Sequence, residues 1–152
     1  MKRRFVLTAI AVGAASLASP LLAAGSLPRV DVYKSPTCGC CGAWVDHLKA
    51  AGFAVKVVEV DDTAEARRRF GVPEKFGSCH TGVVDGYVVE GHVPPADIKR
   101  LLASRPAALG LAVPGMPIGS PGMEYPGRSD PYDVLLIDRK GRESIFAHYP
   151  KA

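Results

Sequence analysis

The chain has 152 residues, with 19 Lys and Arg against 15 Asp and Glu and a formal net charge of +4. This length fits one domain with an ordinary core and excludes two. Lys2, Arg3 and Arg4 lie in a predicted leader that has no acidic residue, and without them 16 basic residues face 15 acidic ones. The nearly neutral remainder excludes a basic surface of the kind that binds nucleic acid or anionic membranes.

Residues 1–25 have the layout of an export signal: the basic start MKRR, an apolar run, and then Ala, Gly and Ser. Small residues and a proline interrupt the run between Gly13 and Pro20, before it reaches the roughly 20 apolar residues of a membrane span. We expect cleavage between Ala23 and Ser26, which would release residues 26–152 into the periplasm as one domain without a membrane anchor. The pair Arg3-Arg4 leaves a twin-arginine export route open.

The first half of this domain predicts alternating strands and helices. Val30–Tyr33 forms a short strand, Cys41–Leu48 carries apolar residues at helical spacing, and Val55–Val60 forms a valine-rich second strand. A second helix begins with Asp62 as its cap and ends at Gly71.

A hairpin and a helix follow. Asp85-Gly86 predicts a tight turn between two short strands that together span Val83–Val89. Pro94-Pro95 opens a helix that stops near Pro106. The order strand, helix, strand, helix, hairpin, helix predicts an α/β fold with a thioredoxin-like domain.

The C-terminal part is expected to add two features to this domain. Five Gly and four Pro between Gly110 and Gly127 predict a long extended loop, and loops of this length are usually functional or disordered. Tyr132–Ile137 and Ser144–Tyr149 predict a C-terminal β-hairpin whose first strand is apolar enough to be buried.

Three of the four cysteines stand where the first strand turns into the first helix. The stretch V-Y-K-S-P-T-C-G-C-C is similar to the glutaredoxin active-site stretch, in which C-x-x-C opens the first helix. Cys38 and Cys41 occupy the two redox positions, and Cys40 is additional. The N-terminus of a helix favours thiolates, which suits nucleophiles and metal ligands alike.

Cys79 lies just before the third strand, where redox enzymes with the thioredoxin fold have a cis-proline. If the fold prediction holds, Cys79 adds a fourth sulfur to the same pocket. Four thiolates suit Cu(I), zinc or an iron-sulfur centre. The neighbours Cys40 and Cys41 do not easily face one ion, but they can bridge different ions, which favours a polynuclear cluster.

Four motifs in order extend the comparison over nearly the whole domain: Y-K-S-P-T-C-G-C-C-G-A-W, G-S-C-H-T, V-E-G-H-V-P and G-L-A-V-P-G-M-P-I-G-S-P-G-M-E. Together they resemble the CopG-like metal-binding family, which is found alongside copper-resistance genes. The resemblance implies an exported thioredoxin-like protein that binds copper through Cys38, Cys40, Cys41 and Cys79.

Further side chains are candidate ligands. His80 joins the site only if the turn continues through it, because successive residues of a strand point to opposite faces. Met116 and Met123 place thioethers, which suit Cu(I), in the extended loop as a lid or as weak ligands. The other histidines are expected outside the site: His47 in solvent, His92 shaping a loop and His148 on a strand surface.

Three functions remain open. The first is an exported protein that holds Cu(I) in copper handling or resistance, with copper ions and other periplasmic copper-handling proteins as partners. The second is a glutaredoxin-like thiol-disulfide oxidoreductase, with Cys38 as nucleophile and Cys41 as the resolving thiol. The third is a zinc-stabilised module, which C-x-C-C serves less well than two C-x-x-C knuckles. Cys79 in place of the cis-proline favours the first function over the second.

Overall fold

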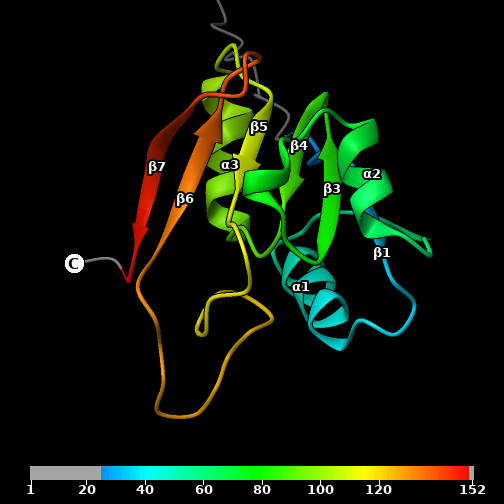
Figure 1. The fold of residues 1–152 in the computed structure, drawn as a ribbon, viewed down its shortest axis with the longest axis vertical. Helices are drawn as coiled ribbons and strands as arrows, with labels where there is room; N and C mark the ends of the chain where they lie inside the picture. Colours follow the sequence, from blue (N-terminus) through cyan, green and yellow to red (C-terminus); the bar gives the residue numbers. More distant parts are fainter. Residues whose placement is uncertain (1–24, 151–152) are drawn as a thin grey trace, which may run out of the picture.

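A seven-stranded sheet in the order β2-β1-β3-β4-β5-β6-β7 runs through the computed structural model, which describes residues 25–150 (Figure 1). The strands are β1 (Val30–Lys34), β2 (Val55–Glu59), β3 (His80–Val84), β4 (Tyr87–Glu90), β5 (Gly110–Ala112), β6 (Tyr132–Ile137) and β7 (Glu143–Tyr149). The helices are α1 (Gly39–Ala50), α2 (Thr63–Arg69), α3 (Pro95–Ser104) and the short 3-10 helix η1 (Glu74–Phe76).

The predicted export signal falls on residues 1–25, nearly all of which lie outside the described residues, so it stays a prediction. Within residues 25–150, no helix is both long enough and apolar enough to cross a bilayer.

The first four strands follow the predicted order. β1 pairs with β2 in parallel and with β3 antiparallel, and β3 and β4 form the hairpin that Asp85-Gly86 predicts. Both turn residues have positive φ, 47° at Asp85 and 83° at Gly86, as a tight two-residue hairpin turn requires. The expected mixed α/β fold is therefore confirmed, with its elements in the order expected of a thioredoxin-like domain.

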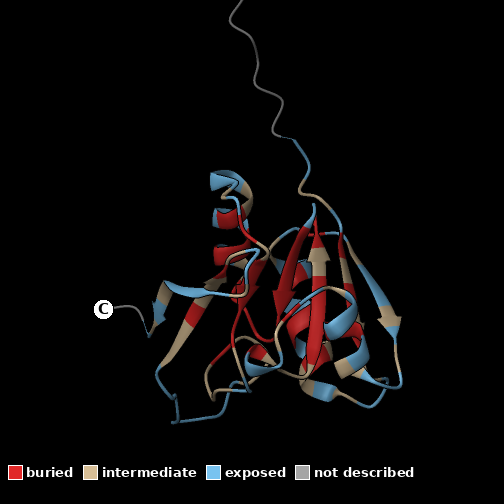
Figure 2. Ribbon diagram, turned by 45° about the horizontal axis from the view of Figure 1, so that its top comes forward, coloured by how far each residue is buried: buried red, intermediate tan, exposed pale blue. Residues whose placement is uncertain are grey.

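The core lies between the sheet and the inner faces of α1 and α3. Trp44 and Leu48 of α1 and Ile98 and Leu101 of α3 are fully buried in one hydrophobic cluster. The Trp44 indole also donates a hydrogen bond of 2.9 Å to the carbonyl of Val93. Every residue of β4 is buried, whereas β7 at the sheet edge is largely exposed (Figure 2). The buried side of α1 fixes the direction in which its first turn, with the cysteines, points.

The prediction of an extended loop from Gly110 to Gly127 is wrong at its start, because Gly110–Ala112 forms β5. This strand pairs in parallel with β4 and antiparallel with β6, and it thereby joins the C-terminal hairpin to the main sheet. At Gly110 a Cβ atom would come within 1.7 Å of the carbonyl oxygen of Val88. The glycine that suggests a loop in the sequence is instead required by a close approach of two strands.

Candidate metal centre

The strand-to-helix junction presents three cysteines at the N-terminus of α1. Cys38 is the N-cap residue, and no side chain caps this end of the helix or adds an acidic group to its first turn. Cys38 and Cys41 form a disulfide with their Cα atoms 5.4 Å apart, while Cys40 and Cys79 are free thiols. The structure is thus an oxidised form of the pair at the two redox positions.

Cys79 brings the fourth sulfur to this junction from the residue before β3. Its Sγ lies 3.5 Å from that of Cys41 and 3.9 Å from that of Cys40, which in turn lies 3.5 Å from the Sγ of Cys38. All four sulfur atoms lie within 4.8 Å of one another. We call these four atoms the sulfur cluster. The convergence predicted from the sequence is therefore present in the fold.

Two buried histidines extend the sulfur cluster on the side of Cys79. The Nδ1 atom of His80 lies 3.2 Å from the Cys79 sulfur, and the Nε2 atom of His92 lies 3.1 Å from it. Both rings are fully buried. His80 thus faces Cys79 although it is the first residue of β3, and its role as a metal ligand stays a prediction.

The expectation that His92 only shapes a loop is wrong. β3 and β4 pair Thr81 with Glu90, and the same register continued by two residues sets His92 opposite Cys79. The position of His92 opposite Cys79 could have been predicted from the sequence, because Asp85-Gly86 fixes the register of a two-residue hairpin.

Hydrogen bonding and burial fix the protonation of both imidazoles. The Nδ1–H of His92 donates to the carbonyl of Pro121 at 2.8 Å, so its Nε2 lone pair faces the Cys79 sulfur. Burial lowers the pKa of His92, and burial followed by the charge of His92 lowers the pKa of His80 to about 3. The Nε2 atom of His80 is buried without a hydrogen-bond partner among the described residues. Both rings are thus neutral near pH 7, which is the state that ligates metals.

The thiol of Cys79 is held in its protonated form when no metal is present. Burial, and secondly the charge of Cys40, raise the pKa of Cys79 to about 12. A cation that binds here must therefore displace a proton from Cys79, and its affinity must rise with pH.

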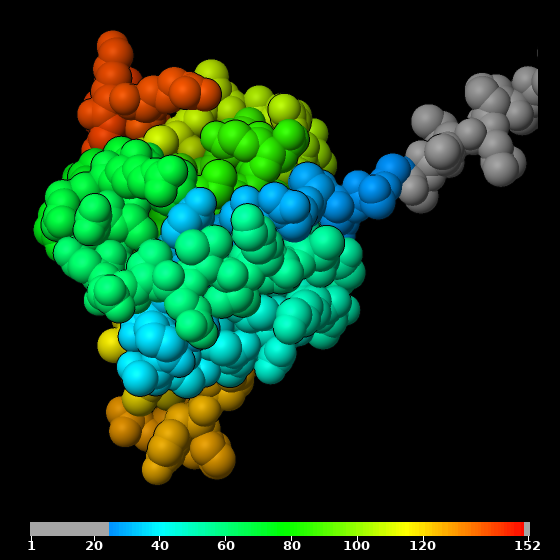
Figure 3. All heavy atoms as spheres, turned by 90° about the vertical axis from the view of Figure 1, so that its right-hand side faces the viewer, coloured from blue at the N-terminus to red at the C-terminus, as the bar shows by residue number. Residues whose placement is uncertain are grey.

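The loop between β5 and β6, residues 113–131, lies against the cluster; we call it the Pro/Gly loop. Gly122 packs so closely on α1 that a Cβ atom would come within 2.7 Å of the Cys40 carbonyl. Figure 3 shows the orange part of the loop beside the cyan residues where α1 begins. His47 of α1, exposed as expected, pairs with Glu124 of the loop at 2.6 Å.

The two methionines lie in this loop. Met116 is 52% exposed, and Met123 is partly buried beside a turn at Ser120. Their role as a lid or as weak ligands stays a prediction. His148 lies on the exposed face of β7, as expected, and pairs with Asp133 at 2.6 Å.

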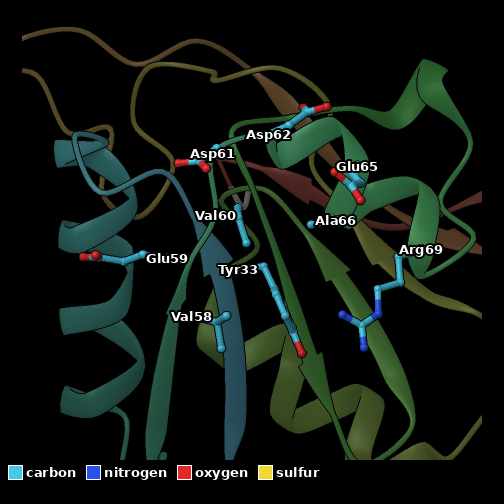
Figure 4. A pocket seen from close by; sticks show the side chains of 9 residues that line it. All are labelled: Tyr33, Val58, Glu59, Val60, Asp61, Asp62, Glu65, Ala66 and Arg69. Atoms are coloured by element: carbon cyan, nitrogen blue, oxygen red, sulfur yellow. The ribbon is translucent and has the colours of Figure 1, made fainter.

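A surface cleft of about 360 Å³ lies elsewhere, between the end of β2 and α2. The acidic residues of its lining are Glu59, Asp61, Asp62 and Glu65. Their side chains do not converge, because Glu59 points away from Asp62 and Glu65 (Figure 4). The cleft contains none of the cysteines, so the convergent chemistry of the described residues lies at the sulfur cluster.

Comparisons with known proteins identify the family of the chain. A protein-family model described as "Protein of unknown function, DUF411" matches residues 76–123, a stretch that includes Cys79 and His92. A comparison with curated protein sequences finds no significant match. Two solved structures described as copper resistance protein CopG, forms 2 and 1, are each 49% identical to the chain, cover 82% of it and match over 99% of their own length, with TM-scores of 0.78 and 0.77. The chain belongs to the CopG family of copper resistance proteins.

Proposed function

We propose that this chain is an exported, periplasmic copper-binding protein that holds Cu(I) in copper handling or resistance. The observation that carries the proposal is the convergence of four cysteine sulfurs within 4.8 Å of one another, with two neutral imidazoles beside them. Thiolates and imidazoles are donors that suit copper, and thiolates favour Cu(I). The similar solved structures are described as copper resistance proteins, which supports the choice of copper over zinc.

The donor set favours a polynuclear cluster over a single ion. Six residues supply donors, which exceeds the four positions of a tetrahedral site: Cys38, Cys40, Cys41, Cys79, His80 and His92. The Cys79 sulfur belongs both to the sulfur cluster and to a second group of donors that it forms with His80 and His92. It lies within 4 Å of two cysteine sulfurs and two ring nitrogens. Cys79 is therefore the residue best placed to bridge ions.

Copper loading requires a change of redox state. The disulfide between Cys38 and Cys41 takes two thiolates out of the donor set. A reductant must supply two electrons, which together with two protons from water convert the disulfide to two thiols; copper that binds then displaces these two protons into the solvent. We expect other copper-handling proteins of the periplasm to deliver or receive the metal.

The first test is an anaerobic titration of fully reduced protein with Cu(I) against a competing chelator, with the thiols counted on the same sample. We expect four thiols and saturation above one Cu(I) per chain. Saturation at one ion or fewer, with all thiols reduced, would contradict the polynuclear site. The same titration with Zn²⁺ shows whether the sulfur cluster prefers copper.

The Cys79→Ser substitution tests the bridging role. It removes one ligand and no strand, so the variant should fold while its Cu(I) affinity falls by more than the roughly 10- to 100-fold that loss of a ligand's supporting partner costs. Competition with the chelator measures the affinity. Binding as tight as that of the parent would remove Cys79 from the site.

A thiol-disulfide oxidoreductase is the second candidate function, and the disulfide at the N-terminus of α1 favours it. Cys79 argues against it, because its sulfur lies 3.5 Å from that of Cys41, in the space where an enzyme would present a substrate chain. Glutathione-coupled turnover that Cys38→Ser abolishes and Cys79→Ser leaves unchanged would reverse this ranking.

A further inference from the structure

A buried ion pair lies directly behind the segment that presents Cys79. Arg67 of α2 and Glu90 of β4 have side chains 7% and 0% exposed, and the Nε atom of Arg67 donates to a Glu90 carboxylate oxygen at 2.8 Å. Neither side chain contacts a cysteine sulfur through any hydrogen bond in the described residues. Direct ligation of copper therefore does not explain why Arg67 and Glu90 are buried here.

The hydrogen bonds of this pair converge on Ser78. The backbone N–H of Ser78 donates to Glu90 Oε1 at 2.8 Å, and the backbone carbonyl of Ser78 accepts from Arg67 at 2.7 Å. Thr81 donates from its hydroxyl to the other Glu90 oxygen at 2.6 Å. Both backbone polar groups of the residue before Cys79 are thus held by one ion pair, and Thr81 fixes the orientation of the carboxylate.

Neighbouring contacts leave the segment little freedom. At Gly77 a Cβ atom would come within 2.7 Å of the Arg67 guanidinium, so the backbone rests directly on this side chain. On the other side, Gly115 of the Pro/Gly loop donates its N–H to the Gly77 carbonyl at 3.0 Å and accepts from the Ser78 hydroxyl. The segment before Cys79 is clamped from both sides.

Stability alone explains such a pair poorly. Burying two charges carries a large desolvation cost, and replacing a buried pair by apolar residues is often neutral or stabilising. Buried polar groups can instead specify one arrangement of the chain.

We infer that Arg67 and Glu90 are positioning residues for Cys79: they fix the backbone of Ser78 so that the Cys79 sulfur faces Cys40 and Cys41. The consequence for copper rests on the proposed function, whereas the geometric consequence holds for the metal-free protein. The two are tested separately.

The metal-free test measures how well Cys79 is presented to Cys41. Cys38→Ser and Cys40→Ser leave these two thiols, whose sulfurs lie 3.5 Å apart. Glutathione disulfide converts them to a protein disulfide and two molecules of glutathione, and the equilibrium gives their effective concentration. In this background we expect Arg67→Met with Glu90→Leu to lower the effective concentration about tenfold, through loss of both hydrogen bonds to Ser78.

Two further variants make the result decisive. Thr81→Val leaves the ion pair intact and should lower the effective concentration about two- to threefold, since one neutral hydrogen bond is lost. Glu74→Gln is the matched control, because the exposed Glu74 contacts the same guanidinium at 2.8 Å but not Ser78. It should leave the value unchanged. If the double variant fails to fold, the inference is tested by comparing the effective concentrations in Thr81→Val and Glu74→Gln.

The inference is wrong if the effective concentration is unchanged both in Thr81→Val and in a folded double variant. It is also wrong if Glu74→Gln lowers the effective concentration as much as these variants do. With all four cysteines present, the double variant should bind Cu(I) about 10- to 100-fold more weakly than the parent, at equal thiol count. If the parent itself binds no Cu(I), the proposed function fails, and the glutathione equilibrium still tests the positioning role.

Discussion

His92 is the residue that links the sulfur cluster to the Pro/Gly loop. One ring nitrogen lies 3.1 Å from the Cys79 sulfur, and the other donates to the Pro121 carbonyl. Metal-binding histidines commonly donate their second ring N–H to such an acceptor, which fixes the tautomer and the ring orientation. A loop carbonyl thereby sets which nitrogen of His92 is free to ligate.

The His92→Gln substitution tests this at the residue scale. Glutamine retains a polar side chain but cannot hold both the Pro121 carbonyl and a metal in the geometry of the ring. We expect Cu(I) affinity to fall at least tenfold, about the lower limit for loss of a supporting partner of a metal ligand. His148→Gln, at an exposed position on β7, is the control. Equal affinities of the two variants for Cu(I) would exclude His92 as a ligand.

At the scale of elements, the Pro/Gly loop completes the site that α1 and β3 begin. It contacts the segment before Cys79 through Gly115, His92 through Pro121, and the first turn of α1 through Gly122. The high content of glycine reflects these close approaches as well as turns. Gly122 has a φ of +88° and lies against backbone atoms that cannot move aside.

Gly122→Ala should therefore act on the site and on stability together. A Cβ atom would meet the Cys40 carbonyl and the Trp44 nitrogen below 3 Å, so the loop must lift from α1. Chemical denaturation should show a loss of about 1–3 kcal/mol, the range for strained positive-φ residues, and the Cu(I) affinity should fall. Gly127→Ala carries a similar φ of +71° with no atom within 4 Å of the new Cβ. Gly127→Ala should therefore lower the stability but leave the Cu(I) affinity unchanged. An equal loss of Cu(I) affinity in both variants would refute a direct role of the loop.

Much of this arrangement follows from local sequence. The i, i+3, i+4, i+7 spacing from Cys41 to Leu48 predicts α1, and Asp85-Gly86 predicts the β3–β4 hairpin, because both depend on neighbours in the chain. The place of Cys79 follows once the fold order is accepted.

The remainder depends on contacts between distant segments. Nothing local distinguishes Gly110 in a strand from a glycine in a loop, because its role is set by Val88 across the sheet. The Arg67–Glu90 pair is likewise unreadable from the sequence, where Arg67 is one of three successive arginines. Only packing shows which one is buried.

For the whole molecule, the buried histidines predict a dependence of stability on pH. Burial lowers the pKa of His80 from 6.5 to about 3, and lowers that of His92. Below pH 6.5 the unfolded chain binds protons at these rings while the folded chain does not, so protons favour unfolding. Well above pH 6.5 the rings are neutral in both states, and this contribution vanishes.

We therefore expect the free energy of unfolding of the metal-free protein to fall only slightly between pH 7.5 and 6.5, and to fall more steeply as the pH drops below 6.5. The slope from each buried ring is at most about 1.4 kcal/mol per pH unit. Denaturant unfolding at pH 7.5, 6.5 and 5.5 stays above the range in which most carboxylates titrate. His80→Gln should make the fall between pH 6.5 and 5.5 smaller, because only the His92 contribution then remains, whereas His148→Gln, at an exposed position on β7, should retain the full fall. A parent protein equally stable at pH 7.5 and 5.5 would mean that the two rings accept protons in the folded state, and neutral imidazoles could then no longer be counted among the donors at the sulfur cluster.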